Sequence, residues 1–309
     1  MNPLRAVADS SAMRWFKKRG PTRVLFRNDV FRRLNQARLR AACDAAARRD
    51  PERFADVRTF CLFIGHMKSG TSLIGSLLDA HPNAVVSDEA DALRFVEEAG
   101  FSRLELFHML DRAARTEARR GRVTARRLGG YSLAVPGGYQ GRSERPLVVG
   151  DGRAGPTTTR LDEDPAVLER FRTLLGDVAL RVVWVVRNPF GPIGASTVRG
   201  ERTFEQAIDH YFARCDALAR VGVQLDGVDV LTVRYEDLVA DPRGRLGALC
   251  AFLGLEVEGA YLSRSAALVV PKAERLVEWE EPWISQVESR MRAYDFLSGY
   301  AYEPGVMSR

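Results

Sequence analysis

Five short apolar runs in the sequence constrain the fold more than any other feature. Each run is apolar along most of its length and does not alternate with polar residues: FCLFIG, AVVSD, PLVVGD, LRVVWVVRN and VDVLTVRYED. Strands that are buried on both faces of a parallel sheet have this character. Helix-like stretches separate the runs: TSLIGSLLDA, FSRLELFHMLDRAARTEARR, DPAVLERFRTLLG, FEQAIDHYFARCDALARV and DPRGRLGALCAFLG. This alternation predicts an α/β fold, with a P-loop-like parallel β-sheet flanked by helices in a single domain.

One of these helices is delimited by its own sequence. Asp241 stands at the N-cap, Pro242 at the first helical position and Gly254 just beyond the last turn. Aspartate accepts hydrogen bonds from the free N–H groups of a first turn, and glycine readily adopts the left-handed conformation that ends a helix. We therefore expect a helix between these residues.

The beginning of the chain differs from the rest. Residues 1–57 are basic, and FRRLNQARLRAACDAAARRD carries apolar residues at helical spacing between arginines. We expect a basic helical N-terminal segment packed on an α/β domain at residues 58–309. A membrane-surface or partner-binding arm is the alternative. Within the domain, the glycine-rich stretch LGGYSLAVPGGYQGR at 128–142 predicts an irregular insertion, such as a lid or a substrate loop.

Composition narrows the class of protein. No apolar stretch reaches the roughly 18–20 residues that cross a bilayer, and the start lacks a signal-peptide core, so we expect a soluble, cytoplasmic protein. A net charge of +6 suits an anionic ligand. Aromatic residues do not interleave with basic stripes, which argues against nucleic acid. The cysteines form no CxxC pair and are expected to be buried thiols: Cys43, Cys61, Cys215 and Cys250.

The segment GHMKSGTS, residues 65–72, joins the first apolar run to the first helical stretch. A glycine-rich turn between strand and helix directs backbone N–H groups and the helix dipole at an anion. The glycine and serine spacing matches the nucleotide-binding Walker A loop, GxxxxGK[ST]. Thr71, however, occupies the lysine position of that loop, and Lys68 lies inside it. The ATP-dependent phosphotransferase hypothesis is weakened by this change.

Lys68 is one of only four lysines among 46 basic residues, in a chain that otherwise uses arginine. A lysine inside the loop can reach the oxygen that bridges a 5′-phosphate to the group attached to it. That oxygen gains negative charge as the group leaves. A cation beside it therefore stabilises the transition state more than the ground state, as catalysis requires.

Three segments together resemble the PAPS-dependent sulfotransferases. GHMKSGTSLIGSLLDAHP is similar to the 5′-phosphosulfate loop of that family, and RVVWVVRNPFGPIGAS is similar to its 3′-phosphate segment. RYEDLVADP, followed by LCAFLGL, is similar to the strand–loop–helix near the adenine. The resemblance covers roughly residues 60–300. It implies PAPS (3′-phosphoadenosine 5′-phosphosulfate) as sulfuryl donor, no required metal, and closer similarity to the carbohydrate-modifying branch.

The same resemblance implies a role for individual residues. The loop would hold the 5′-phosphate, with its lysine on the leaving oxygen. The second segment would hold the 3′-phosphate, and the third would line the adenine site. An arginine at the carboxyl end of a β-run also stands where ligands bind in open parallel sheets. The predicted donor-binding residues are Lys68, Ser69, Gly70, Thr71, Ser72, Arg187, Ser196 and Tyr235.

Transfer to an alcohol needs a base near the acceptor hydroxyl. No histidine lies in the short His-Leu-Pro-like context that the cytosolic branch uses. In the carbohydrate-modifying branch a glutamate follows the next strand, which implies Glu89 in AVVSDEADALRF. A partly buried carboxylate there could serve as base. Asp88 and Asp91 compete for this role, and an exposed helix-capping acid is the alternative interpretation of Glu89.

Two further cations are candidates for the site. Related bacterial sequences carry a Gly-Asp-Lys-Lys type segment where this chain has VVGDGRAGPTTTRL, so Arg153 is a candidate acceptor-side contact. Lys272, in VVPKAERL, is a candidate for the 3′-phosphate.

The sequence thus predicts sulfuryl transfer from PAPS to a hydroxyl of a carbohydrate or small-molecule acceptor. The phosphotransferase and a non-catalytic nucleotide-binding protein are the alternatives. No nucleic-acid partner or transmembrane segment is expected, and peripheral membrane contact through the basic N-terminus stays open.

Overall fold

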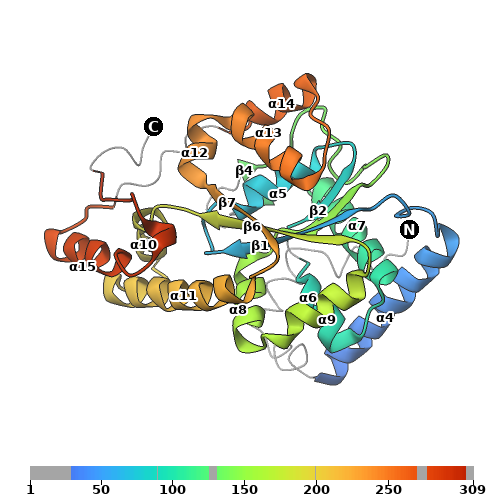
Figure 1. Ribbon diagram of the computed structural model, residues 1–309, viewed down its shortest axis with the longest axis horizontal. Helices are drawn as coiled ribbons and strands as arrows, with labels where there is room; N and C mark the ends of the chain where they lie inside the picture. Colours follow the sequence, from blue (N-terminus) through green and yellow to red (C-terminus); the bar gives the residue numbers. More distant parts are fainter. Residues whose placement is uncertain (1–28, 89, 125–130, 199, 270–276, 304–309) are drawn as a thin grey trace.

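The computed structural model describes residues 29–88, 90–124, 131–198, 200–269 and 277–303. At its centre is a five-stranded sheet of order β2-β5-β1-β6-β7 (Figure 1), in which every neighbouring pair is parallel. The predicted α/β fold is therefore confirmed, and each apolar run contains one strand. The strands are β1 (Thr59–Gly65), β2 (Ala84–Ser87), β5 (Val148–Asp151), β6 (Ala179–Val186) and β7 (Asp229–Arg234).

Helices cover both faces of the sheet (Figure 1). On one face lie α4 (Asp29–Arg49), α6 (Ala92–Ala99), α7 (Arg103–Arg119), α8 (Ala154–Glu163), α9 (Ala166–Leu175) and α11 (Phe204–Gln224). On the other face lie α5 (Thr71–Asp79), α12 (Tyr235–Ala240), α13 (Pro242–Leu253) and α14 (Gly259–Ala266). A third cluster joins α11 to α10 (Phe190–Val198) and α15 (Glu281–Met291).

The central strand supplies both cores. Phe60, Leu62 and Ile64 of β1 pack into the core on the α7 and α9 face. Cys61 and Phe63 point the other way, into the core beneath α5 and α13. Successive side chains of a strand face opposite sides of the sheet. A strand between two helical layers must therefore be apolar at every position, which explains why these runs do not alternate.

The carboxyl ends of all five parallel strands lie along one edge of the sheet, where ligands bind in open α/β folds. Because β1 is central, it divides this edge in two. The turns after β6 and β7 lie on one side of the glycine-rich loop, and the turns after β5 and β2 lie on the other.

Helix α4 packs against α7 and the core beside it. Cys43 of α4 is buried in the core with Phe54 and Phe107. Arg40 Nε donates to Glu105 Oε1 at 3.0 Å. The remainder of the predicted N-terminal segment, residues 1–28, lies outside the described residues.

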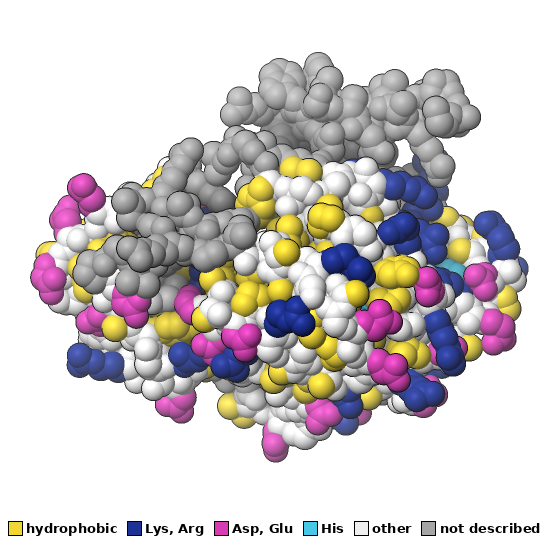
Figure 2. Space-filling model, turned by 90° about the horizontal axis from the view of Figure 1, so that it is seen from above, with side chains coloured by type: hydrophobic (Ala, Val, Ile, Leu, Met, Phe, Trp, Pro, Cys, Tyr) yellow, Lys and Arg dark blue, Asp and Glu magenta, His cyan; other side chains and the backbone are white. Residues whose placement is uncertain are grey.

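The expected character of the cysteines is also confirmed, because all four are buried free thiols. Charged side chains of both signs are interspersed on the described part of the face in Figure 2. Along the described ranges, no helix has the length and apolarity needed to cross a bilayer.

Two segments are held in place by hydrogen bonds from their own polar groups. Helix α8 forms despite the low helix propensity of GPTTT, and its threonine hydroxyls donate to the carbonyls four residues earlier. The described part of the 128–142 stretch is anchored on α5. There the Gln140 amide donates to Ser76 and Leu133, and the Gly141 N–H donates to Asp79. Residues 128–130 lie outside the described residues.

Candidate functional site

The loop between β1 and α5 has a backbone that requires glycine at two positions. Gly65 and Gly70 have φ of 140° and 97°, and Lys68 between them has φ of 69°. A Cβ on Gly65 would lie 2.5 Å from the carbonyl oxygen of Val185. A Cβ on Gly70 would lie 2.4 Å from Cδ2 of Tyr235. The loop is therefore pressed against both β6 and the residue that follows β7.

The start of α5 offers an anion site. Its N-cap is Gly70, no side chain caps the first turn, and that turn holds no acidic residue. The first N–H groups of a helix have no partner within the helix, and the positive end of the helix dipole lies there. A bound phosphate would satisfy those groups.

Arg187 connects the loop to the two strands beside it. It follows the carboxyl end of β6, and its Nη1 donates to the Lys68 carbonyl oxygen at 2.9 Å. Its guanidinium carbon lies 4.2 Å from the centroid of the Tyr235 ring. That ring in turn contacts Gly70. The structure thus brings together residues from all three segments on which the predicted donor site depends.

The Lys68 side chain points to a carboxylate that the sequence analysis missed. Lys68 Nζ lies 2.9 Å from Glu201 Oε2, and Ser196 Oγ donates to the same oxygen at 3.3 Å. Arg202 Nη1 lies 3.4 Å from Ser196 Oγ. An anionic group therefore already occupies the point on which Lys68 and Ser196 converge. No motif surrounds Glu201, so only tertiary structure reveals it.

Neutralising Glu201 should strengthen binding of an anionic ligand at this point. The ion pair is partly exposed, and such pairs contribute about 0.2–1 kcal/mol, so we expect Glu201→Gln to bind adenosine 3′,5′-bisphosphate up to about five-fold more tightly. Isothermal titration calorimetry at two salt concentrations checks this. Glu205→Gln, the same change at a neighbouring exposed position, is the control. Equal or weaker binding by the Glu201 variant would contradict the expectation.

His66, the second residue of the loop, has a buried side chain. Its ring stacks on Tyr211 with centroids 3.9 Å apart, and its Nε2 lies 3.3 Å from Cys215 Sγ. Burial, together with the charge of Arg214, lowers the pKa of His66 to about 3. The imidazole is therefore neutral at ordinary pH and supports the shape of the loop.

On the other side of β1, the turn after β5 meets the loop. A Cβ on Gly155, in the first turn of α8, would lie 3.1 Å from Met67 Cγ. Arg153 is the exposed N-cap residue of α8. A Cβ on Gly152 would lie 3.6 Å from Asp88 Oδ1, so the turns after β5 and β2 are in contact.

Two of the predicted site residues cannot be located in this arrangement. Glu89, the predicted base, and Lys272, the candidate for the 3′-phosphate, both lie outside the described residues.

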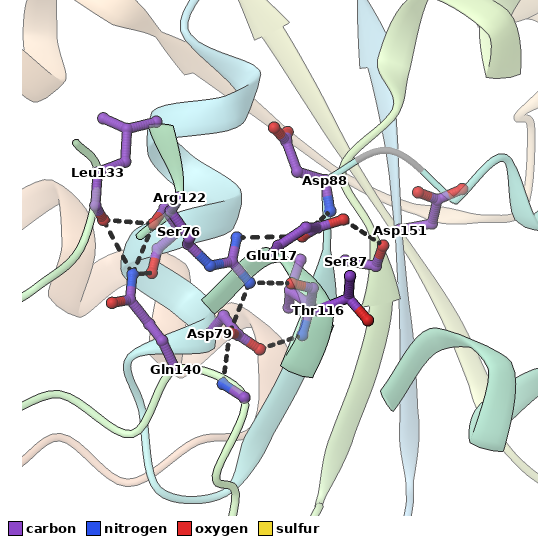
Figure 3. Close-up of polar contacts among 12 residues, drawn as sticks. Ser76, Asp79, Ser87, Asp88, Thr116, Glu117, Arg122, Leu133, Gln140 and Asp151 are labelled. Carbon is purple, nitrogen blue, oxygen red and sulfur yellow. Dashed lines mark hydrogen bonds and ion pairs between the residues drawn. The ribbon is translucent and has the colours of Figure 1, made fainter. Parts of the chain in front are cut away.

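Two acids stand beside the turns after β5 and β2: Asp151, which is fully buried, and Glu117, which is partly buried (Figure 3). Burial raises the pKa of Asp151, at the end of β5, to about 6. Burial also raises the pKa of Glu117, on α7, to about 7, although the charge of Arg122 opposes the shift. The sequence analysis missed both acids. An aspartate closing the run PLVVGD was an available signal for Asp151, whereas Glu117 lies in the polar helical stretch RTEARR and gave none.

Residues 155–259 match the model of the sulfotransferase family. The matched range includes Arg187, Ser196 and Tyr235, and it begins after the glycine-rich loop. The match spans 105 of the 309 residues of the chain. No curated protein matches the chain.

Several solved sulfotransferases are similar in structure. The sulfotransferase domain of the Synechococcus PCC 7002 olefin synthase is 20% identical, over 78% of this chain and 96% of its own, with a TM-score of 0.46. A sulfotransferase from Alicyclobacillus acidocaldarius is 18% identical, over 80% and 98%, with a TM-score of 0.42. Mouse sulfotransferase SULT7A1, complexed with PAP, is 12% identical, over 84% and 87%, with a TM-score of 0.37. At these identities the likeness concerns the fold alone.

Proposed function

We propose that this protein is a sulfotransferase, which moves a sulfuryl group from PAPS to a hydroxyl of a carbohydrate or small-molecule acceptor. The observation that carries the proposal is the convergence of Arg187 and Tyr235 on the Lys68 loop, at the uncapped start of α5. Phosphate groups suit helix N-termini and guanidinium groups, and an aromatic ring suits a purine.

In the proposed reaction the acceptor oxygen attacks sulfur while the bond from sulfur to the bridging phosphate oxygen breaks. Lys68 compensates the charge that develops on that oxygen, and the amides of residues 69–72 hold the 5′-phosphate. Arg187 and Ser196 hold the 3′-phosphate, and Tyr235 lines the adenine site. The acceptor proton passes to a carboxylate, and adenosine 3′,5′-bisphosphate leaves.

We assign that carboxylate to the β2–α6 turn, with Glu89 as the base. Asp91, one of its two competitors, is engaged by Arg160, whose Nε and Nη2 donate to the two carboxylate oxygens at 3.0 and 3.3 Å. Both oxygens of the Asp91 carboxylate are therefore already engaged by a guanidinium. Arg153, exposed on the neighbouring turn, is the proposed contact for the acceptor.

A ligand titration tests the donor assignment. We expect adenosine 3′,5′-bisphosphate to raise the melting temperature of the chain, because a ligand that binds the folded state stabilises it. We expect ATP with Mg²⁺ to have a smaller effect. Stabilisation by ATP and Mg²⁺ alone would favour the phosphotransferase hypothesis instead. Labelled sulfate from PAPS, offered with a panel of monosaccharides and phenols, then separates an enzyme from a nucleotide-binding protein.

A further inference from the structure

The turn between β2 and α6 is fixed at both of its ends by carboxylates, one fully buried and one partly buried. Asp151, which is fully buried, accepts the Ala92 N–H on Oδ2 at 2.6 Å and the Arg153 N–H on Oδ1 at 3.3 Å. One side chain thereby joins the start of α6 to the start of α8. This aspartate holds the two turns together alongside a direct backbone contact, in which the Gly152 N–H donates to the Ser87 carbonyl oxygen at 2.6 Å.

Glu117 holds the other end of the same turn from α7 (Figure 3). Its Oε1 accepts the Ser87 hydroxyl at 3.1 Å, and its Oε2 accepts the Asp88 N–H at 3.0 Å. Arg122 Nη1 lies 3.6 Å from Oε2 and orients the carboxylate. The residues on both sides of position 89 are therefore bound to acids on two separate elements.

These two acids are an unusual choice if the turn needs only to be folded. A buried carboxylate loses its hydration, and burial raises the pKa of both groups toward neutrality. An apolar side chain of similar volume often serves as well in a purely structural position. Asp151 ends β5 and Glu117 binds the end of β2, so both act on the β5–β2 side of the glycine-rich loop, opposite β6 and β7.

We propose that Asp151 and Glu117 are positioning residues for the acceptor, which fix the β2–α6 turn against the β5–α8 turn and aim both at the Lys68 loop. This inference rests on the proposed function and adds to it two residues that act through backbone N–H groups without touching the substrate. An error of about 1 Å in such alignment can cost about 10²-fold in rate. The acceptor-dependent rate should therefore depend on both carboxylates, and donor affinity should not.

The ionisation of Asp151 and Glu117 should make the transfer rate depend on pH, which a purely structural role would not do. Asp151 faces Asp91, Arg153 and the Cys61 thiol, and Glu117 faces Arg122 and Asp88. Protonation would turn a carboxylate oxygen that accepts an N–H into a hydroxyl that opposes it. We expect the transfer rate to fall as the pH drops through about 7 to about 6.

The stability of the fold should change in the opposite direction. An acid whose pKa is raised on folding contributes stability that is complete below its unfolded pKa and is lost as the pH rises through the folded value. Wild-type protein should therefore lose more thermal stability between about pH 5 and about pH 8 than Glu117→Gln does.

The test compares Asp151→Asn and Glu117→Gln with exposed controls, Asp226→Asn and Glu169→Gln. Labelled PAPS at saturation, with the panel of monosaccharides and phenols, gives the transfer rate. We expect the transfer rate of Asp151→Asn and of Glu117→Gln to fall by about 10²-fold. The acid side of the pH–rate profile should become flatter in both variants. The dissociation constant for adenosine 3′,5′-bisphosphate should not change. Unchanged rates, or a parallel loss of bisphosphate affinity, would overturn the inference.

Ser87→Ala provides a second test if Asp151→Asn and Glu117→Gln do not fold. This variant removes one hydrogen-bond donor to Glu117 and keeps the carboxylate. Loss of that donor raises the pKa of Glu117, so the acid side of the pH–rate profile should move to higher pH. A pH–rate profile that does not move in this variant contradicts the proposal. Wild-type protein that binds no bisphosphate contradicts the proposed function instead, so the two failures are distinguishable.

Discussion

Lys68→Met is expected to lower the rate of sulfuryl transfer by about 10²–10³. The variant keeps the length of the side chain and the backbone constraint at φ 69°, and it removes the charge. The bridging oxygen would then leave without a cation beside it. Adenosine 3′,5′-bisphosphate has no sulfuryl group, so its dissociation constant should change much less than the rate.

Single-turnover kinetics with labelled PAPS, together with calorimetry for the bisphosphate, checks this expectation. Arg38→Met, on the exposed surface of α4, is the matched control for loss of one positive charge. An equal loss in rate and in bisphosphate affinity would show that Lys68 contributes uniform binding only. A rate like that of the wild type would remove Lys68 from the mechanism.

Arg122→Leu is expected to destabilise the fold by about 3–5 kcal/mol, because it leaves buried acids without their partner. Arg122 is buried, and its Nη2 lies 2.5 Å from Asp79 Oδ2 and 2.9 Å from the Val86 carbonyl oxygen (Figure 3). The same guanidinium faces Glu117. The substitution therefore separates α5, β2 and α7 at once.

Urea unfolding measures this loss. Arg94→Leu, which breaks the partly exposed pair with Glu98 within α6, is the contrasting variant and should cost at most about 1 kcal/mol. A loss below about 1 kcal/mol for the Arg122 variant would mean that the buried acids accept protons or water in place of the guanidinium.

The sheet and the glycine-rich loop could be predicted from sequence because their causes are local. Continuous apolar runs follow from burial on two faces, and the Asp241 cap forms as its sequence indicates, with Oδ1 accepting the Gly244 N–H at 3.0 Å. Helix α8 could not be predicted in this way. Its glycine and proline disfavour a helix, and it is stabilised by contacts such as the fully buried Leu161.

Glu201, Asp151 and Glu117 could not be assigned to the site from the sequence, because their partners are distant along the chain. Glu201 meets Lys68 across 133 positions of the chain, and Asp151 meets Ala92 across 59. Such pairings arise from the strand order and carry no local periodicity. The assignment of Glu89 as base stays a prediction.

Under the proposed function, the central place of β1 separates the donor and acceptor residues along the chain. The donor-side strands β1 and β6 pair directly through seven residues, from Thr59 with Ala179 to Gly65 with Val185. Every acceptor-side strand and turn lies in the single stretch of sequence between them. A change in that one contiguous block can alter acceptor choice while leaving the β6 and β7 contributions to nucleotide binding intact. Selection for a new acceptor therefore needs to act on only one continuous part of the coding sequence.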